Sequence, residues 1–344
     1  MNNSVVLNYT AKYFINSGNI NLTFGLIGCI LNGFVCYIIG THKSLRQPFN
    51  YLILNLAISD FLVSLAVASN SILNYVASRH TGQLFNIFDA MNISCKFIIF
   101  CCLSSFSSTS LTLLAISVER CQCITAKYKY KMKISTARKA IILIWFLAIS
   151  SSTTLAYYGK AEREIGYDCC FDRIKTLWLL ILGLTLSIVT AILPIAFMSV
   201  LYIYVAYKLY VKLQLSNESN AGFTEKRRKY LRRSITVIII ISVFTFTTGL
   251  PFLLLHTIVI IGHNKTFGSF QLHDNFLGGT ASFLFLLSPI LNPLLYNLAS
   301  SPFRKVILSY LPLFRNHSSK SMKGQALKVQ FIGQLNNITD LQKI

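Results

Sequence analysis

The sequence predicts an all-α membrane protein, a seven-transmembrane helix bundle with a short amphipathic eighth helix. The first observation is composition, because 53% of the 344 residues are hydrophobic and only 12% are charged, against about 25% charged in a typical soluble domain. The second observation is the placement of charge. Seven windows contain no Lys, Arg or Glu: 22–41, 51–75, 97–118, 140–158, 176–207, 234–262 and 276–298.

Each window can cross a bilayer, because about 20 helical residues span its hydrocarbon core. Proline in the later windows is compatible with a membrane helix, which can satisfy the backbone groups that proline frees. After the last window, apolar side chains at helical spacing predict a helix on the inner membrane surface: Phe303, Val306, Ile307, Tyr310 and Leu311. We expect an extracellular N-terminus over 1–21, a seven-transmembrane domain with this helix over 22–311, and a cytoplasmic tail over 312–344.

Charge in the loops predicts the orientation of the chain. The net charge is +21 at pH 7, from 32 Lys and Arg against 11 Asp and Glu. Of the 32 basic residues, 24 lie in the alternate segments 42–50, 119–139, 208–233 and 299–344. Because basic loops remain in the cytoplasm, we expect a multi-pass plasma-membrane protein with its N-terminus outside. The charge then indicates topology and contact with membrane lipid, not nucleic acid.

The outer segments contain candidate modification sites. N-x-Ser/Thr triplets in the N-terminal segment predict glycosylation at Asn2, Asn8 and Asn21. Cys95 lies at the outer end of the third window, and Cys169 and Cys170 lie in the second outer loop. All three cysteines are on the oxidising side of the membrane. We therefore expect a disulfide from Cys95 to Cys169 or Cys170, between which the sequence does not decide.

Asp60 is the only formally charged side chain inside the seven windows. A carboxylate at that depth must be paired, hydrated or protonated, which marks it as a candidate functional residue. Polar residues of other windows lie at similar depth: Asn32, Ser105, Thr109, Ser288 and Asn292. Oxygen ligands around one carboxylate suit a hard cation, so the cluster around Asp60 is a candidate Na⁺ site. The alternative is a hydrogen-bond cluster that joins the helices, and we expect no other cofactor.

Sequence motifs follow one another through windows two to seven. They are Leu56-Ala57-Ile58-Ser59-Asp60, Glu119-Arg120-Cys121, Trp145, Pro194 with Tyr202, Pro251, and Asn292-Pro293-Leu294-Leu295-Tyr296. In this order they resemble the rhodopsin-like (class A) family of G-protein-coupled receptors. The resemblance runs from Asn32 to about Leu311 and covers most of the chain.

The resemblance implies a receptor, not an enzyme. Ligand binding among the outer halves of the helices would let the sixth span swing outward about Pro251. The inner ends of the helices would then receive the α subunit of a heterotrimeric G protein. The coupling residues that carry over are Glu119, Arg120, Tyr202, Pro251, Asn292, Pro293 and Tyr296. The family's sodium-site region matches Asp60, Thr109, Ser288 and Asn292.

The chain departs from the family pattern mainly in the sixth span. Gly249 stands where the family usually has a tryptophan, and the usual phenylalanine near Thr245 is displaced by one position. Leu231 stands where some members carry a glutamate that pairs with the span-three arginine, and Cys121 replaces a common tyrosine. We therefore expect a resting state that is less restrained than usual, with measurable basal signalling.

Aligned to the family, two residues exclude ligand classes. Cys102 stands where amine receptors have an aspartate, and Leu286 stands where opsins bind retinal covalently. A short peptide or another small extracellular ligand remains, and a peptide is preferred. The candidate pocket residues are Asn70, Asn74, Cys102, Phe106, His256, Ser282 and Phe285. For each of them the alternative is simple helix packing.

Two other functions remain as alternatives. A multi-pass transporter or channel would have several ionisable groups in its spans, and only Asp60 fits. A receptor-like scaffold that binds partners without coupling is compatible with the missing tryptophan. An enzyme is disfavoured, because no nucleophile-base set or paired carboxylates stand out in the sequence.

Overall fold

The computed structural model describes residues 3–79, 84–125, 132–162, 168–171, 177–214, 236, 239–240, 242–255, 257–258, 276–299 and 301–310. Its helices are α1 (Asn3–Thr41), α2 (Pro48–Arg79), α3 (Leu84–Thr125), α4 (Ile134–Ala156), α5 (Leu177–Ser187), α6 (Leu193–Gln214), the unlabelled helix Ser242–Leu255, α8 (Phe276–Ala299) and α9 (Ser301–Tyr310). A short 3₁₀ helix, Lys43–Leu45, connects α1 to α2. Helices occupy nearly all the described residues of the seven windows, which confirms the all-α seven-helix bundle.

The helices have the apolar surface of a membrane protein. In the part of the chain that the structure describes, five stretches are long and apolar enough to cross a bilayer: Asn19–Thr41, Pro48–Ala77, Phe88–Gln122, Ile134–Ala156 and Ile181–Val205. Ser242–Leu255 and Thr280–Leu294 are shorter apolar helices within the described residues. Large apolar side chains face outward, such as Ile142, Phe146 and Ile203, which are 70%, 66% and 71% exposed. Such surfaces are stable in contact with lipid and not with water.

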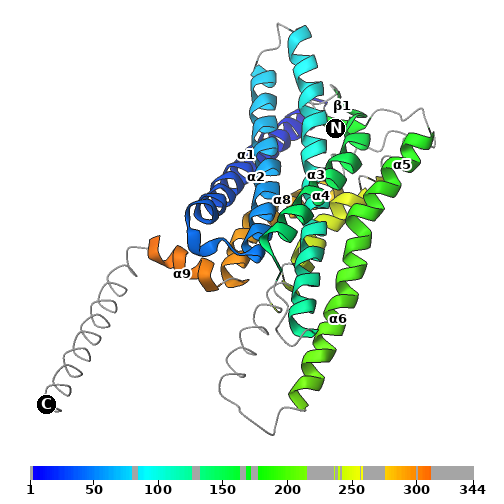
Figure 1. Cartoon of the computed structure of the whole chain (residues 1–344). Coiled ribbons are helices and arrows are strands. Elements are labelled where there is room, and N and C mark those ends of the chain that lie inside the picture. The colour runs from blue at the N-terminus through cyan, green and yellow to red at the C-terminus, as the bar shows by residue number, and fades with distance from the viewer. Residues whose placement is uncertain are drawn as a thin grey trace, which may run out of the picture. The chain divides into compact units, whose positions relative to one another are not determined.

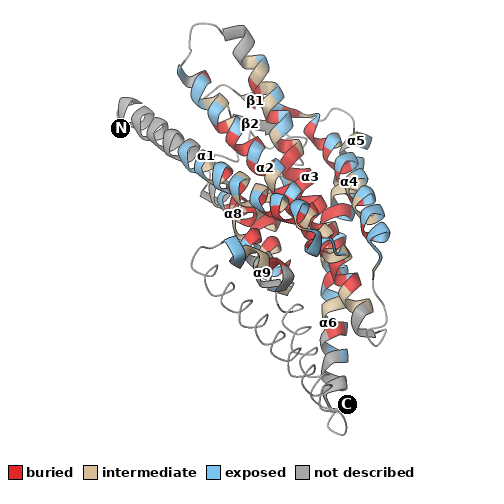
Figure 2. Ribbon diagram, turned by 60° about the vertical axis from the view of Figure 1, so that its left-hand side comes forward, coloured by how far each residue is buried: buried red, intermediate tan, exposed pale blue. Residues whose placement is uncertain are grey.

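Helix α3 occupies the middle of the bundle and packs against α2, α4 and α6 (Figure 1). Buried residues line the inner faces of α2 and α3 (Figure 2). Many of those on α3 carry hydroxyls: Ser104, Ser105, Ser107, Ser108, Thr109, Ser110 and Thr112. Small residues let membrane helices approach closely, and their hydroxyls can bond to neighbouring helices.

Asn55 of α2 links three helices. Its Nδ2 donates to Thr112 Oγ1 of α3 at 2.8 Å, and its Oδ1 accepts from Trp145 Nε1 of α4 at 2.7 Å. Asn55 is 1% exposed, so leaving its amide unpaired would cost about 1–3 kcal/mol. These bonds fix α4 against the α2–α3 pair and give Trp145, one of the sequence motifs, a structural role.

The fifth span contains a π-helical turn, Ile188–Ile192, between α5 and α6. Thr190 of this turn is fully buried. Its hydroxyl lies 3.1 Å from the Ser107 hydroxyl of α3 and donates to Ser151 of α4 at 3.4 Å. The turn is therefore held by hydrogen bonds to two neighbouring helices.

A two-stranded antiparallel hairpin is attached to the outer end of α3. Strands β1 (Gly159–Glu162) and β2 (Asp168–Phe171) pair so that Ala161 lies opposite Cys169. Cys169 forms a disulfide with Cys95, with their Cα atoms 5.2 Å apart. The backbone N–H of Ala161 donates to Asn92 Oδ1 of α3 at 2.8 Å. The predicted disulfide is thus present, and Cys169 is the partner of Cys95.

The two ends of the chain agree in part with the expectations. Helix α1 begins well before the first window, and Asn21 falls inside the candidate span that starts at Asn19. Asn2 lies outside the described residues, so glycosylation stays a prediction. Helix α9, in the unit Ser300–Ile344, covers most of the amphipathic segment. Its place on the inner membrane surface and the domain limits also stay predictions.

Candidate functional site

Asp60 lies on α2 within the helix bundle and is 3% exposed. From α8, the Nδ2 of Asn292 donates to Oδ2 of Asp60 at 3.0 Å and to the Ser288 hydroxyl at 3.3 Å. Ser288 and Asn292 are four residues apart, so they occupy the same face of α8. The structure therefore brings together three polar residues that the sequence places at similar depth in separate spans.

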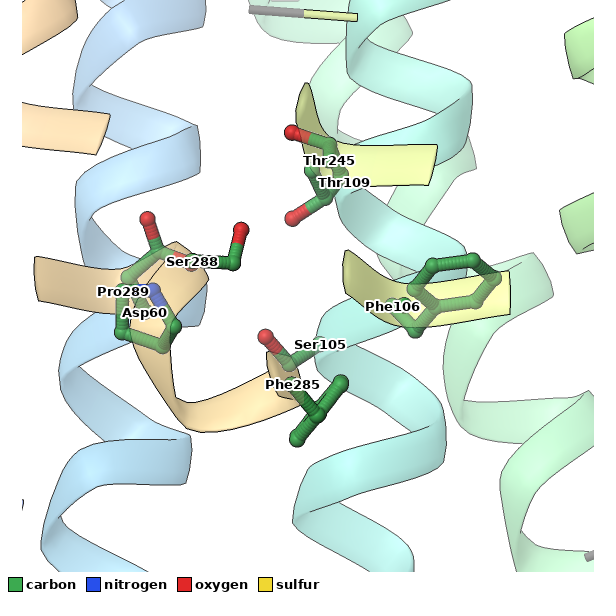
Figure 3. Close-up of a pocket in the computed structure, with 9 residues that line it drawn as sticks. Asp60, Ser105, Phe106, Thr109, Thr245, Phe285, Ser288 and Pro289 are labelled. Carbon is green, nitrogen blue, oxygen red and sulfur yellow. The ribbon is translucent and has the colours of Figure 1, made fainter. Parts of the chain in front are cut away.

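A small cavity lies beside Asp60 (Figure 3). The centre of a water-sized sphere can move through about 10 Å³ of this cavity. The cavity therefore has room for about one water molecule or small ion. The lining residues are Asp60, Ser105, Phe106, Thr109, Thr245, Gly249, Phe285, Ser288 and Pro289. One carboxylate surrounded by hydroxyl oxygens is a ligand set that hard cations prefer. The residues of this cavity therefore fit Na⁺.

Asn32 joins α1 to α8 close to this cavity. Its Nδ2 donates to the backbone carbonyls of Gly28 at 3.0 Å and Pro289 at 2.7 Å. The carbonyl of Pro289 belongs to a residue that also lines the cavity. Asn32 thus holds the α8 backbone in place beside Asp60. The sequence predicted the depth of Asn32 but not this contact with α8.

Arg120 lies at the inner end of α3 between an acid and an aromatic ring. Its Nε lies 3.2 Å from Oε2 of Glu119, and only about a tenth of either side chain is exposed. Its guanidinium carbon lies 4.1 Å from the centroid of the Phe49 ring, near the start of α2. A cation over an aromatic face is attracted by the ring quadrupole, and more strongly away from water. Arg120 is therefore held by both α3 and α2.

Tyr202 connects three spans through its hydroxyl. The Ser117 hydroxyl of α3 donates to the Tyr202 hydroxyl of α6 at 2.7 Å. The Tyr202 hydroxyl also shares a hydrogen bond of 3.0 Å with the Ser242 hydroxyl of the sixth span, in the helical stretch Ser242–Leu255. We call Ser117, Tyr202 and Ser242 the tyrosine clasp. The clasp lies one helical turn before Arg120 on α3, so the two features are adjacent along that helix.

Among the remaining coupling residues, Pro251 is half-buried and Pro293 is buried. Pro251 lies in the helix Ser242–Leu255, and Pro293 and Tyr296 lie in α8. The side chain of Tyr296 lies outside what the structure describes, as does Leu231.

The candidate ligand residues separate into polar and apolar groups. Asn70 accepts a hydrogen bond from Ser94 at 2.8 Å. The buried Oδ1 of Asn74 has no hydrogen-bond partner among the described residues. Ser282 is half-buried on α8, and His256 lies outside the described residues.

The apolar candidates belong to one buried cluster. Cys102, Phe106 and Phe285 are 6%, 5% and 5% exposed and share this cluster with Leu253. The Phe285 ring stacks on Phe252, with ring centroids 4.5 Å apart and planes 17° apart. We call Phe106, Phe252 and Phe285 of this cluster the aromatic layer.

Several residues of these contacts were not predicted from the sequence. They are Phe49, Asn55, Ser117, Ser242 and Thr245. The depth of Thr245 was readable, because it lies two turns before Pro251, and its hydroxyl-bearing side chain could have been assigned to the polar cluster. No sequence signal identifies Phe49 as the partner of Arg120.

Comparison with known proteins gives the class of the chain. The family model "7 transmembrane receptor (rhodopsin family)" matches residues 31–296. The chain belongs to this family, and it is therefore a multi-pass membrane receptor. The fold is shared with the crystal structure of squid rhodopsin at a TM-score of 0.69 and 21% identity, over 88% of this chain and 82% of that chain.

Particular relatives include a melanopsin and receptors that are named for peptides. A melanopsin of Podarcis siculus is 26% identical over 87% of this chain and 62% of its own length. The pyroglutamylated RF-amide peptide receptor of Mus musculus is 24% identical, over 84% of this chain and 69% of its own length. Neuropeptide FF receptor 1 of Rattus norvegicus is 25% identical, with corresponding shares of 81% and 66%. The chain thus spans less than two thirds of the length of that melanopsin.

Proposed function

We propose that the chain converts binding of an extracellular ligand into nucleotide exchange on a heterotrimeric G protein. The observation that supports this best is the tyrosine clasp, which ties the helix Ser242–Leu255 to α3 and α6. An outward swing of the sixth span must break the bond between Tyr202 and Ser242. The same movement separates that helix from the end of α3 that carries Arg120.

The energies involved are suited to a switch. A net hydrogen bond contributes about 0.5–1.5 kcal/mol, and coupling between two sites in a receptor is about 1–3 kcal/mol. A ligand that binds one arrangement of the helices more tightly than the other can therefore open the clasp. Signalling needs only this bistable element and two sites that bias it.

A short extracellular peptide is the ligand class we favour. Two of the relatives described above are peptide receptors by name. Cys102 offers no carboxylate to pair with a monoamine, and it is buried in an apolar cluster. The likeness to melanopsin does not extend to a bound chromophore, because Leu286 has no amine for a Schiff base. A small ligand that is not a peptide is the alternative.

Na⁺ is the ion we assign to the cavity beside Asp60. The residues that would hold it are Asp60, Ser105, Thr109 and Ser288, which line the cavity together. When bound there, the ion would neutralise the buried carboxylate and connect α2, α3 and α8. The loop charges support an N-terminus outside the cell, with the basic inner loops next to lipid and the G protein.

A G-protein dissociation panel in cells tests the proposed function, first without ligand and then with peptide and metabolite libraries. Arg120→Ala should abolish coupling with unchanged surface expression, because it removes the guanidinium that we place at the G-protein interface. Arg79→Ala is the matched control, since Arg79 is an exposed basic residue in the last turn of α2 and lies outside the basic inner segments.

Unchanged coupling in Arg120→Ala contradicts the role of that residue. A receptor that binds ligand but activates no G protein would be a non-coupling scaffold. Ion flux through the purified protein in vesicles without any G protein would identify a transporter or channel.

A further inference from the structure

Gly249 lies directly against the ring of Phe106. A Cβ atom placed on Gly249 would lie 2.7 Å from Cδ2 and 3.2 Å from Cζ of Phe106, and closer still to Cε2. Real Cβ atoms do not approach other atoms at less than 3.0 Å. The ring of Phe106 therefore occupies the space that any side chain at position 249 would enter.

Phe106 belongs to the aromatic layer of α3, α8 and the helix Ser242–Leu255. It is 5% exposed and lies in the same cluster as Phe285, which stacks on Phe252. Phe106, Phe285 and Gly249 also line the cavity beside Asp60, and Figure 3 shows the Phe106 ring there. One ring thus touches the apolar layer, the backbone of the sixth span and the polar cavity.

Glycine inside a helix costs about 1 kcal/mol relative to alanine. A glycine in the middle of the helix Ser242–Leu255 therefore calls for a packing reason, and the Phe106 ring supplies one. Because the ring meets the helix backbone and no flexible side chain, little can yield between them in a close-packed interior. A displacement of the ring must then move the sixth span.

We infer that Phe106 is the aromatic lever of this receptor, by which we mean the ring whose displacement moves the sixth span. The ring belongs to the third span and fills the space that a side chain at position 249 of the sixth span would occupy. A ligand that pushes Phe106 displaces the helix at Gly249 and reshapes the Asp60 cavity in the same movement. The inference rests on the proposed function only for G-protein activation, and the contact between Phe106 and Gly249 does not depend on it.

The inner end of the bundle provides a reporter that needs no G protein. Cys121 of α3 and Ile239 of the sixth span both pack against the buried Val205 of α6, so opening of the bundle should speed the reaction of Cys121 with a maleimide. The labelling rate is measured by mass spectrometry of the purified full-length protein in a Cys123→Ser background. Basal G-protein activation in cells is measured in parallel.

Gly249→Ala should force the ring and the sixth span apart. We expect labelling and basal activation to rise about two- to thirtyfold, the range of one contact in an allosteric network. In the double variant Phe106→Ala/Gly249→Ala the clash is absent, so both rates should fall back toward those of Phe106→Ala alone. Gly40→Ala is the matched control, because nothing lies within 4 Å of a Cβ at Gly40.

Two results overturn the inference: a labelling rate in Gly249→Ala equal to that of Gly40→Ala, or additive effects of the two substitutions. If the labelling rates of the single and double variants are coupled as expected but no variant activates a G protein, the result supports the lever and refutes the proposed function. The two failures are therefore distinguishable.

Discussion

The guanidinium of Arg120 stacks on Phe49, with 4.1 Å between the guanidinium carbon and the ring centroid. The contact joins the inner ends of α3 and α2, whereas the pairing expected in some family members joins α3 to the sixth span. Phe49 and Glu119 together hold the arginine that we assign to G-protein coupling. Their contacts must loosen before Arg120 can bind a partner.

Phe49→Leu should raise basal signalling, because leucine keeps an apolar side chain but has no π face. A cation–π contact contributes about 0.5–2 kcal/mol, which corresponds to a rise of about two- to thirtyfold. G-protein dissociation without ligand measures it against the unmutated receptor, which should itself exceed empty cells. Phe49→Tyr keeps the ring and is the control. A Phe49→Leu receptor no more active than Phe49→Tyr would refute a restraining role for the ring.

Tyr202→Phe removes the hydroxyl of the tyrosine clasp and leaves Ser117 and Ser242 without that partner. Each lost bond costs about 0.5–1.5 kcal/mol, so the variant should be less stable to heat than the unmutated protein. Coupling should change as well, because the clasp holds the sixth span. Thermal unfolding in detergent and the G-protein panel measure the two effects. Ser199→Ala, which removes an exposed hydroxyl of α6, should alter neither. A Tyr202→Phe protein of unchanged stability and coupling would show that the clasp contributes to neither.

Asp60→Asn should abolish stabilisation by Na⁺. An ion that binds only the folded protein raises its unfolding temperature as its concentration increases. We expect a higher unfolding temperature for the purified receptor in NaCl than in KCl of equal ionic strength, and no difference for Asp60→Asn. Equal temperatures for the unmutated receptor in both salts would remove the ion assignment. The hydrogen-bond cluster would then stand alone.

Cys169→Ser should sharply lower the amount of folded receptor at the cell surface. Removing a native disulfide typically costs about 2–5 kcal/mol, and this one connects α3 to the outer hairpin across 74 residues. Cys170→Ser is the neighbouring control and should be tolerated. Surface antibody binding measures both. Equal loss in the two variants would contradict the Cys95–Cys169 pairing.

The sequence was sufficient for the spans, because charge is so costly in lipid that its absence marks each crossing. It was also sufficient for the depth of Asp60 and Asn292, since depth follows from position along a helix. Partners such as Phe49 for Arg120 could not be predicted. They depend on how each helix is rotated about its axis, and hydropathy that is apolar on all sides contains little information on rotation. The choice of Cys169 over Cys170 depended on strand register in the same way.

The π-helical turn at Ile188–Ile192 has a consequence for the inner half of the fifth span. Such a turn inserts one residue into an α-helix, and each α-helical residue advances the direction of its side chain by about 100°. The side chains after the turn, including that of Tyr202, are therefore rotated by about 100° relative to their directions in an uninterrupted helix. Deleting a single residue from the turn would therefore point the tyrosine hydroxyl away from Ser117. One residue in the outer half of the span sets the aim of a side chain near the opposite end.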